Sequence, residues 1–333
     1  MTDHQYFKDR ATRVDALPPL EQLPIFTKHA FKLPVITNAG ESSIDLPVNV
    51  IRGRSQSPRL LMIAGVHGNE FDGILAQVEF WQSAKPEDFS GSIVMVPVAN
   101  PPAFQAMQRC NPDDHLDMNR VFPGNANSTL THRLAYRLYQ DVLPGSDFLL
   151  SMHGWHEWGL ILPYIEYPQN SQVSQASREA ACAFGVTYIE SFKWMSGLLV
   201  EAAVRAGIPA IEAEVGGMGV SQSEYRLIYK KGITNILKHL NILPGLPVLP
   251  HAVSDISRSE ICATSNGICF PMANLGQRIK KGMLLAMLTD LNGASSTRYI
   301  APQDGIVASV RLKGAVEPGD IIAILFHKRE LGN

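Results

Sequence analysis

The chain has 333 residues, of which 45% are apolar and 18% are charged, and its 29 Lys and Arg against 31 Asp and Glu give a net charge of -2. This balance excludes the basic surface on which nucleic-acid binding depends. No apolar run approaches the roughly 20 residues of a membrane-spanning helix, and the polar N-terminus lacks the apolar segment of a secretory signal. The four cysteines form no CxxC pair, so we expect reduced thiols and a cytoplasmic protein without nucleic-acid or membrane partners.

Residues 1–30 are irregular in pattern, and we predict that they form an N-terminal arm. Residues 32–53 contain two β-like runs. From residue 59 onward, continuous apolar runs alternate with segments of helical spacing, which predicts buried strands and helices in turn. The predicted strands are 59–66, 92–100, 147–154, 186–190 and 208–217, and the predicted helices are 69–82, 130–143, 171–184, 198–206 and 221–240.

This alternation predicts an α/β fold over residues 31–245, with a mixed, mostly parallel sheet and helices on both of its faces. The alternation stops at a stretch that contains Pro244, Pro247 and Pro250. Because prolines at this spacing exclude a helix, we predict a linker at residues 246–255.

Residues 256–333 are predicted to form a small all-β domain, because β-like runs and Gly turns follow each other there. The segment also repeats itself. Asn266-Gly267-Ile268 is matched by Asp304-Gly305-Ile306, and the run at 281–288 is matched by the run at 318–325. Two similar units of this kind predict a β-domain with a pseudo-twofold axis.

The turns of this domain, Ala301-Pro302 and Gly319-Asp320, give a pattern that resembles the biotinyl/lipoyl-type hammerhead barrel. Carriers of that type attach their group to a Lys in the central hairpin. No Lys occurs between Lys281 and Lys313. We therefore predict a hammerhead-like domain that carries neither biotin nor a lipoyl group.

Two residues after the strand at 59–66 have a spacing that suits metal ligands. His67 and Glu70 lie in Gly65-Val66-His67-Gly68-Asn69-Glu70, where a strand is predicted to pass into a helix. A His-x-x-Glu pair at such a corner can hold one zinc ion, although a capping acid and a loop His would have the same sequence.

Two further residues lie at corresponding positions on other strands. His153 is at the end of the strand at 147–154, and Glu214 is near the end of the strand at 208–217. Ligands of open α/β sheets bind beyond the carboxyl ends of the strands, where all four residues are expected to meet. Two His and one carboxylate suit a catalytic zinc that keeps a position for water. We therefore predict one Zn²⁺ per chain on His67, Glu70 and His153, and Glu214 is left as a general base.

Arg109 opens a polar, irregular stretch that ends at Gly124 and contains Asn119 and Arg120. Ordering a loop of this length is costly unless it lines a site. Arg side chains recognise carboxylates through two parallel hydrogen bonds, but a surface loop with two solvated Arg residues would have the same sequence.

As an ordered set, these motifs resemble the succinylglutamate desuccinylase/aspartoacylase family, which belongs with the zinc carboxypeptidases. The set spans about residues 40–240 and comprises Gly-x-His67-Gly-Asn-Glu70, then Arg109 and Asn119-Arg120-x-Phe-Pro-Gly, then His153, then Ile-Pro-Ala-x-x-x-Glu214-Val-Gly-Gly. Many bacterial members of the family also have a C-terminal β-domain. The resemblance implies that His67, Glu70 and His153 bind zinc.

The resemblance also implies roles for the other motif residues. Glu214 would activate the attacking water. Arg109 would polarise the scissile carbonyl and stabilise the oxyanion. Asn119 and Arg120 would hold the carboxylate of the substrate.

The chain departs from the family pattern at two places. His156 follows His153 closely, but an offset of three residues from a strand end argues against a second ligand. Arg205 is near the place of an Arg that some aspartoacylases use on the acidic side chain of the substrate, but it is out of register, which disfavours acetyl-aspartate and succinyl-glutamate. Three aromatic residues either line a pocket or simply pack, namely Trp155, Trp158 and Tyr164.

These features predict zinc-dependent hydrolysis of the amide bond of a small N-acyl amino acid or a related compound. A metallocarboxypeptidase acting on peptides or peptidoglycan stems is the alternative, because the same residues would serve it. A non-catalytic ligand-binding protein is the third interpretation, but it would need neither Glu214 nor Arg109. The sequence is compatible with a monomer and with a homo-oligomer.

Overall fold

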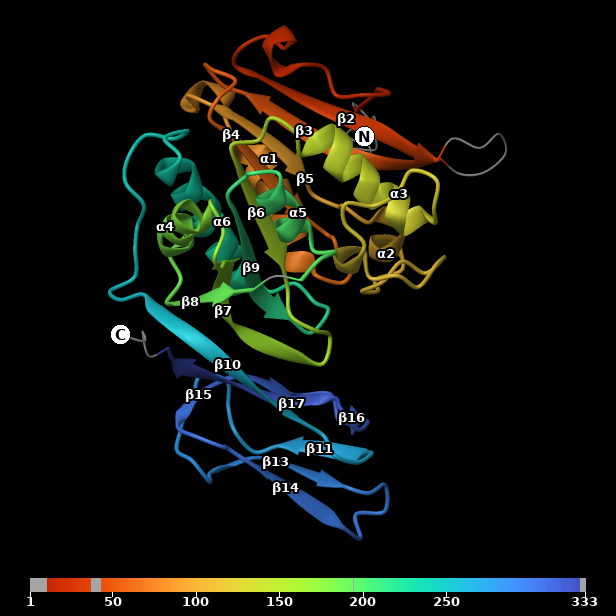
Figure 1. Ribbon diagram of the computed structural model, residues 1–333, viewed down its shortest axis with the longest axis vertical. Coiled ribbons are helices and arrows are strands. Elements are labelled where there is room, and N and C mark those ends of the chain that lie inside the picture. Colours follow the sequence, from red (N-terminus) through yellow and green to blue (C-terminus); the bar gives the residue numbers. More distant parts are fainter. Residues whose placement is uncertain (1–10, 37–42, 194, 330–333) are drawn as a thin grey trace, which may run out of the picture.

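A computed structural model describes residues 11–36, 43–193 and 195–329. A sheet of 13 strands runs through the whole molecule, with helices packed on it in the N-terminal two thirds of the chain and only strands and turns at the C-terminal end (Figure 1). The predicted mixed α/β fold is confirmed. Among the described helices, none is long and apolar enough to cross a membrane.

The centre of the large sheet is parallel, and an antiparallel pairing follows it on either side. Strand β4 pairs in parallel with β5 and β6, and β6 pairs in parallel with β9. In spatial order the strands are β1 (Thr12–Arg13), β2 (Thr27–Ile36), β3 (Ile44–Arg52), β5 (Ser92–Val96), β4 (Arg59–Ala64), β6 (Phe148–His153), β9 (Ala210–Gly217), β7 (Gly159–Pro168), β8 (Tyr188–Phe192), β10 (Ser254–Cys262), β17 (Ile321–Lys328), β15 (Gly305–Arg311) and β12 (Arg278–Ile279).

Helices cover both faces of this sheet, as predicted. On one face α3 (Leu130–Arg137) and α5 (Leu199–Arg205) pack against side chains such as Leu61 and Leu149. On the other face α1 (Phe71–Ser83), α4 (Ser174–Phe184) and α6 (Ser223–His239) pack against neighbours such as Leu60 and Leu150. Because successive residues of a strand point to opposite faces, both faces of the central strands must be apolar, which explains their continuous apolar runs.

Besides the short helix α2 (Pro101–Gln105), which was not predicted, three differences from the predicted elements concern the sheet and its covering helices. Strand β7 was not predicted, because Pro163 interrupts its apolar run; the register with β9 shifts between Ile161 and Tyr164, where a Pro is tolerated. The predicted helix at 130–143 is α3 continued by a π-helical turn at Leu138–Val142. The sheet begins inside the predicted N-terminal arm, because β1 pairs with β2 from Thr12.

The C-terminal strands repeat one pairing pattern. In the first unit β11 (Gly267–Pro271) pairs with β13 (Leu284–Thr289), and in the second unit β15 pairs with β17. Each unit lends a strand to the other, since β11 pairs with β16 (Ala315–Val316) and β15 pairs with β12. The outer pairs also match, because β13 pairs with β14 (Ser296–Ile300) as β17 pairs with β10. The repeat seen in the sequence thus corresponds to a repeat of strand pairing.

These C-terminal strands are continuous with the large sheet. β10 pairs in parallel with β8, and β15 pairs with β7. Side chains of β10 therefore lie beside those of β7 and β8, which carry residues of the pocket described below.

Packing between α4 and α6 depends on a residue without a side chain. A Cβ atom at Gly232 would lie 2.2 Å from Cζ of the buried Phe184. We expect Gly232→Ala to lower the free energy of unfolding by about 1–3 kcal/mol through overpacking. Urea unfolding measures this, and Lys231→Ala, an exposed change on the same helix, should stay within about 0.5 kcal/mol of the wild type. A stabilised Gly232→Ala protein would contradict this packing.

Candidate metal centre and active site

The predicted metal ligands meet at the carboxyl edge of the sheet. His67 follows β4, Glu70 immediately precedes α1, and His153 is the last residue of β6. β4 and β6 are adjacent parallel strands in which Ala64 pairs with Met152, so the loop after β4 lies beside the end of β6. All three side chains are buried.

Two glycines let the loop after β4 take this path. Gly65 has a φ of +64°, in the left-handed region that favours glycine. Gly68 lies so close to the backbone of Ala103 that an added Cβ would be 2.0 Å from its carbonyl carbon. The Gly-x-His-Gly-Asn-Glu motif therefore reflects both a turn and a close approach of two backbones.

The three side chains are arranged as ligands of one ion would be. Their ligand atoms all lie within 4.8 Å of one another. Glu70 Oε1 is 2.7 Å from His67 Nδ1, Glu70 Oε2 is 3.0 Å from His153 Nδ1, and the two Nδ1 atoms are 3.3 Å apart. Ligand bonds of about 2.0–2.1 Å in a tetrahedral site would place neighbouring donors about 3.3 Å apart. Two imidazoles and a carboxylate at these separations fit a zinc ion.

The outer nitrogen of each imidazole is also held. Nε2 of His67 lies 3.0 Å from Oδ1 of Asp117, and Nε2 of His153 lies 3.0 Å from Oγ of Ser151. Both rings therefore present Nδ1 to the centre of the site. Partners of this kind fix the orientation of metal-binding imidazoles. Asp117 lies in the motif Leu-Asp-Met-Asn-Arg, but the sequence did not indicate that its carboxylate would face His67.

The charges of the three ligand side chains and of neighbouring carboxylates shift the pKa values of Glu70 and His153. Burial alone would raise the pKa of Glu70, but the two imidazoles outweigh it and hold that pKa below its usual range. Burial alone would lower the pKa of His153, but the carboxylates of Glu212 and Glu70 raise it to about 10.

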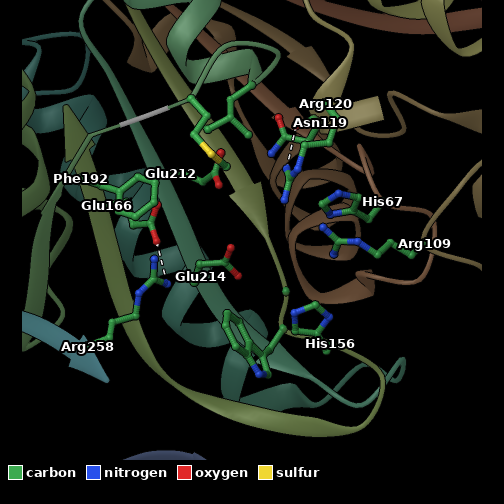
Figure 2. Close-up of a pocket in the computed structure, with 14 residues that line it drawn as sticks. His67, Arg109, Asn119, Arg120, His156, Glu166, Phe192, Glu212, Glu214 and Arg258 are labelled. Atoms are coloured by element: carbon green, nitrogen blue, oxygen red, sulfur yellow. Dashed lines mark hydrogen bonds and ion pairs between the residues drawn. The ribbon is translucent and has the colours of Figure 1, made fainter. Parts of the chain in front are cut away.

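A pocket of about 180 Å³ opens beside these ligands, and the four other predicted site residues, Arg109, Asn119, Arg120 and Glu214, line it (Figure 2). Glu214 is the register neighbour of His153 across the β6–β9 pair. Its Oε2 is buried without a hydrogen-bond partner. Burial, assisted by neighbouring carboxylates, raises the pKa of Glu214 well above its usual value.

Arg109 and the Asn119-Arg120 pair are fixed by different contacts. The Arg109 guanidinium donates to Oδ2 of Asp117 over 3.1 Å and to Oε1 of Glu70 over 3.3 Å. Oδ1 of Asn119 accepts from the backbone N–H of Leu199, so the amide NH₂ is the group left to donate to a ligand. Arg120 is exposed except for a hydrogen bond to the Asn119 carbonyl.

Three charged residues of the pocket were not predicted from the sequence, namely Glu166, Glu212 and Arg258. Glu212 is two residues before Glu214, and the period of a strand places both on one face. Arg258 comes from β10 and forms 3.0 Å ion pairs with Glu166 and Glu190. A pocket residue from the C-terminal strands was not foreseeable, because it depends on the β8–β10 pairing.

The remaining candidates fall inside and outside the pocket. Trp155 and His156 line it, and burial together with the charge of Arg109 lowers the pKa of His156 to about 4. Trp158 lines a neighbouring groove, with the Arg311 guanidinium over its ring. Tyr164 is fully buried and donates to Glu166. Arg205 is exposed and paired with Glu201, so it is not a pocket residue.

Comparison with known proteins identifies the family of the chain. A model of the succinylglutamate desuccinylase/aspartoacylase catalytic domain matches residues 56–240. The chain belongs to this family. The N-alpha-acetyl-L-2,4-diaminobutyric acid deacetylase of Halomonas elongata is 30% identical to it over 311 residues, which cover 90% of this chain and 91% of that protein.

Two solved structures of the family extend the comparison over nearly the whole chain. The product-bound ectoine utilization protein EutE (DoeB) of Ruegeria pomeroyi is 27% identical, with a TM-score of 0.84, over 92% of this chain and 97% of that one. A succinylglutamate desuccinylase from Silicibacter sp. TM1040 is 25% identical, with a TM-score of 0.86, over 94% and 98% of the two chains. Both matches extend past the catalytic family model into the C-terminal strands.

The contact between Asp117 and His67 generates a prediction about metal affinity. Asp117→Ala removes the carboxylate that orients the His67 ring, so we expect zinc affinity to fall by about 10–100-fold. Competition with a chromophoric chelator measures this. Asp113→Ala, which removes an exposed carboxylate from the same loop, should bind zinc as the wild type does. Equal affinities for the two variants would show that Asp117 does not support the site.

Proposed function

We propose that this protein hydrolyses the amide bond of a small N-acyl amino acid, or of a related compound, with the help of one zinc ion. Named relatives of the family are deacylases: a deacetylase of an N-acetylated amino acid and a succinylglutamate desuccinylase. The observation that carries the proposal is the convergence of a three-residue metal group with Glu214 and Arg109 at one pocket.

His67, Glu70 and His153 would hold the zinc ion, because their donor atoms have the chemistry and the separations of a zinc site. When bound, zinc supplies a Lewis acid and lowers the pKa of a coordinated water to about 7. Asp117 and Ser151 would keep both imidazoles oriented toward the ion through their outer nitrogens.

Glu214 would act as the general base. Its carboxylate is buried, its Oε2 is free of hydrogen bonds, and its strand places it next to His153. In this role Glu214 accepts a proton from the attacking water and delivers it to the leaving amine.

Arg109 would stabilise the oxyanion that develops on the scissile carbonyl. Its contacts with Asp117 and Glu70 orient the guanidinium at the rim of the metal group before the substrate arrives. Arg120 and the NH₂ group of Asn119 would bind the substrate carboxylate and so fix the position of the amide bond.

The size of the pocket favours the small-molecule function over the peptidase alternative. Its volume is about 180 Å³, and the strands that close it include β10 from the C-terminal region. A peptide substrate would need a cleft open at both ends of the scissile bond.

We also propose a division of the chain into an arm at 1–30, a catalytic domain at 31–245, a linker at 246–255 and a β-domain at 256–333. The repeated strand pairing after residue 254 supports the last unit. Through Arg258 this unit would complete the wall of the pocket, and we propose no carrier function for it.

The zinc assignment predicts the metal content of the purified protein. We expect about one zinc per chain by elemental analysis, and loss of that zinc in His153→Ala because one of three protein ligands is removed. His251→Ala, outside the pocket-lining set, should keep its zinc. Substoichiometric metal that added zinc does not restore, with no change in His153→Ala, would contradict the assignment.

Glu214 and the ligands should behave differently. We expect Glu214→Gln to keep its zinc and to lower kcat by about 10²–10⁴-fold, because the amide keeps the shape of the side chain but cannot carry the proton. Glu87→Gln, at an exposed and remote position, should retain full activity. Loss of zinc in Glu214→Gln would instead make Glu214 a ligand.

Substitutions of Arg109 and Arg120 should affect different kinetic parameters. Arg109→Lys keeps the charge but loses the fork, so kcat should fall by roughly 10²-fold with a smaller change in KM. Arg120→Lys should raise KM more than it lowers kcat, because a carboxylate is held equally before and during the reaction. Steady-state rates on N-acetyl, N-formyl and N-succinyl amino acids measure both effects, and the reverse pattern would exchange the two roles.

A further inference from the structure

His156 lines the pocket close to Arg109. It lies in the loop between β6 and β7, three residues after His153. The pocket and the neighbouring groove that contains Trp158 have two lining residues in common, and these are Arg109 and His156. Figure 2 shows both of them on the same side of the pocket. The imidazole of His156 is therefore placed beside the guanidinium that we assign to the oxyanion.

The ring nitrogens of His156 are not used within the chain. Among residues 11–36, 43–193 and 195–329, neither nitrogen has a hydrogen-bond or ion-pair partner. Packing holds the ring instead. It is stacked on Trp158, with the ring centroids 5.2 Å apart and the planes 13° apart, and it meets the ring of Trp155 edge-on at 4.9 Å. The ring is thus fixed in place while its polar atoms are left for a ligand.

The imidazole of His156 is neutral at pH 7. Burial, together with the positive charge of Arg109, lowers its pKa to about 4. A neutral imidazole has one N–H donor and one acceptor nitrogen. Beside a guanidinium the N–H is the useful group, because both donors can then share one negative oxygen. A neutral imidazole is able to polarise a carbonyl in this way without giving up its proton.

We propose that His156 is a further catalytic residue, whose ring N–H donates a hydrogen bond to the oxyanion that develops on the scissile carbonyl. This inference rests on the proposed deacylase function. The bonding changes stay the same: the water oxygen forms a bond to the acyl carbon, and the bond from that carbon to the amine nitrogen breaks. Glu214 carries the proton from the water to the amine, and His156 keeps its own proton throughout.

The C-terminal strands hold the loop that carries His156. The backbone N–H of Leu312 donates to the carbonyl of Trp158 over 2.8 Å, and Arg311 of β15 pairs with Gly159 of β7. The buried Arg311 guanidinium lies 4.7 Å from the centroid of the Trp158 ring. Because Trp158 stacks on His156, Arg311 is a positioning residue that acts through Trp158. An oxyanion donor that is fixed before the substrate arrives needs no reorganisation during the reaction.

The first test is kinetic and uses the zinc-loaded protein with the N-acyl amino acids that serve for the two arginines. His156→Phe keeps an aromatic ring for stacking on Trp158 but removes the donor. We expect kcat to fall by about tenfold or more and KM to stay within about threefold of wild type. His156→Gln, which retains an N–H donor, should recover part of the loss. His251→Phe, the same change at an exposed position outside the pocket, should keep wild-type rates.

The second test does not depend on turnover. In a phosphinate analogue of the substrate, tetrahedral phosphorus replaces the amide carbon and bears the negative oxygen of the transition state. Calorimetry compares its Kd with that of the amino acid product, which lacks this oxygen. His156→Phe should weaken binding of the analogue by about tenfold or more and binding of the product by less than about threefold.

The role of Arg311 is tested with the same two ligands. Arg311→Met removes the charge over Trp158, whereas Arg311→Lys keeps it. We expect Arg311→Met to lower kcat and to weaken the analogue more than the product, and Arg311→Lys to restore both. Urea unfolding of each variant measures stability separately. A loss of stability in Arg311→Met with an unchanged ratio of analogue to product affinity would overturn the positioning role.

The remaining outcomes separate this inference from the deacylase function. Wild-type kcat and analogue affinity in His156→Phe would overturn the inference and leave the deacylase function standing. A raised KM with unchanged kcat would make His156 a contact of the bound substrate alone, and loss of zinc would make it a ligand; either result overturns the inference. Absence of hydrolysis by the wild type on every compound would overturn the deacylase function and this inference with it.

Discussion

The parallel pairing of β4, β6 and β9 is the constraint on which the site depends. It brings the loop after β4 to the end of β6, and it sets Glu214 of β9 beside His153. The loop after β4, His153 and Glu214 belong to three different strands, so only the pairing of these strands brings them together. A shift of one residue in either pairing would turn a site residue to the opposite face of the sheet. The apolar clusters on both faces make such a shift costly, because every inward side chain would move with it.

Burial gives this arrangement its chemistry. Glu70, His67 and His153 are almost completely removed from water, where a lone carboxylate would be expensive and a carboxylate between two imidazoles is tolerated. The same loop that contributes Asn119 and Arg120 to the pocket also places Asp117 between His67 and Arg109. Metal support and substrate recognition thus share one irregular segment, which explains why so polar a loop is ordered.

The sequence indicated those site residues that lie at the ends of recognisable strands. His67, Glu70, His153 and Glu214 are each at or near the end of an apolar run, and the rule that parallel strands meet at one edge was enough to bring them together. The family was also identifiable from the order of its motifs, and the matched catalytic domain confirms it. Arg205 was considered as a substrate-binding residue, but its helix places it in solvent beside Glu201, outside the pocket.

The side of the pocket that carries Glu166, Glu212 and Arg258 could not be predicted in the same way. It depends on β7, whose Pro163 hides the strand pattern, and on β10, whose place beside β8 is set by pairing between segments far apart in the chain. Glu166, Glu212 and Arg258 have no motif of their own. They are brought together by the strand register that pairs Glu166 with Glu212 and by the ion pairs of Arg258 with Glu166 and Glu190.

The central claim is that one metal ion is held where β4 and β6 end. Anomalous diffraction at the zinc edge, from crystals of the zinc-loaded protein, tests it most directly. The account predicts one peak per chain within bonding distance of Nδ1 of His67, Nδ1 of His153 and the carboxylate of Glu70. A peak on other residues, or none at this edge of the sheet, would contradict it.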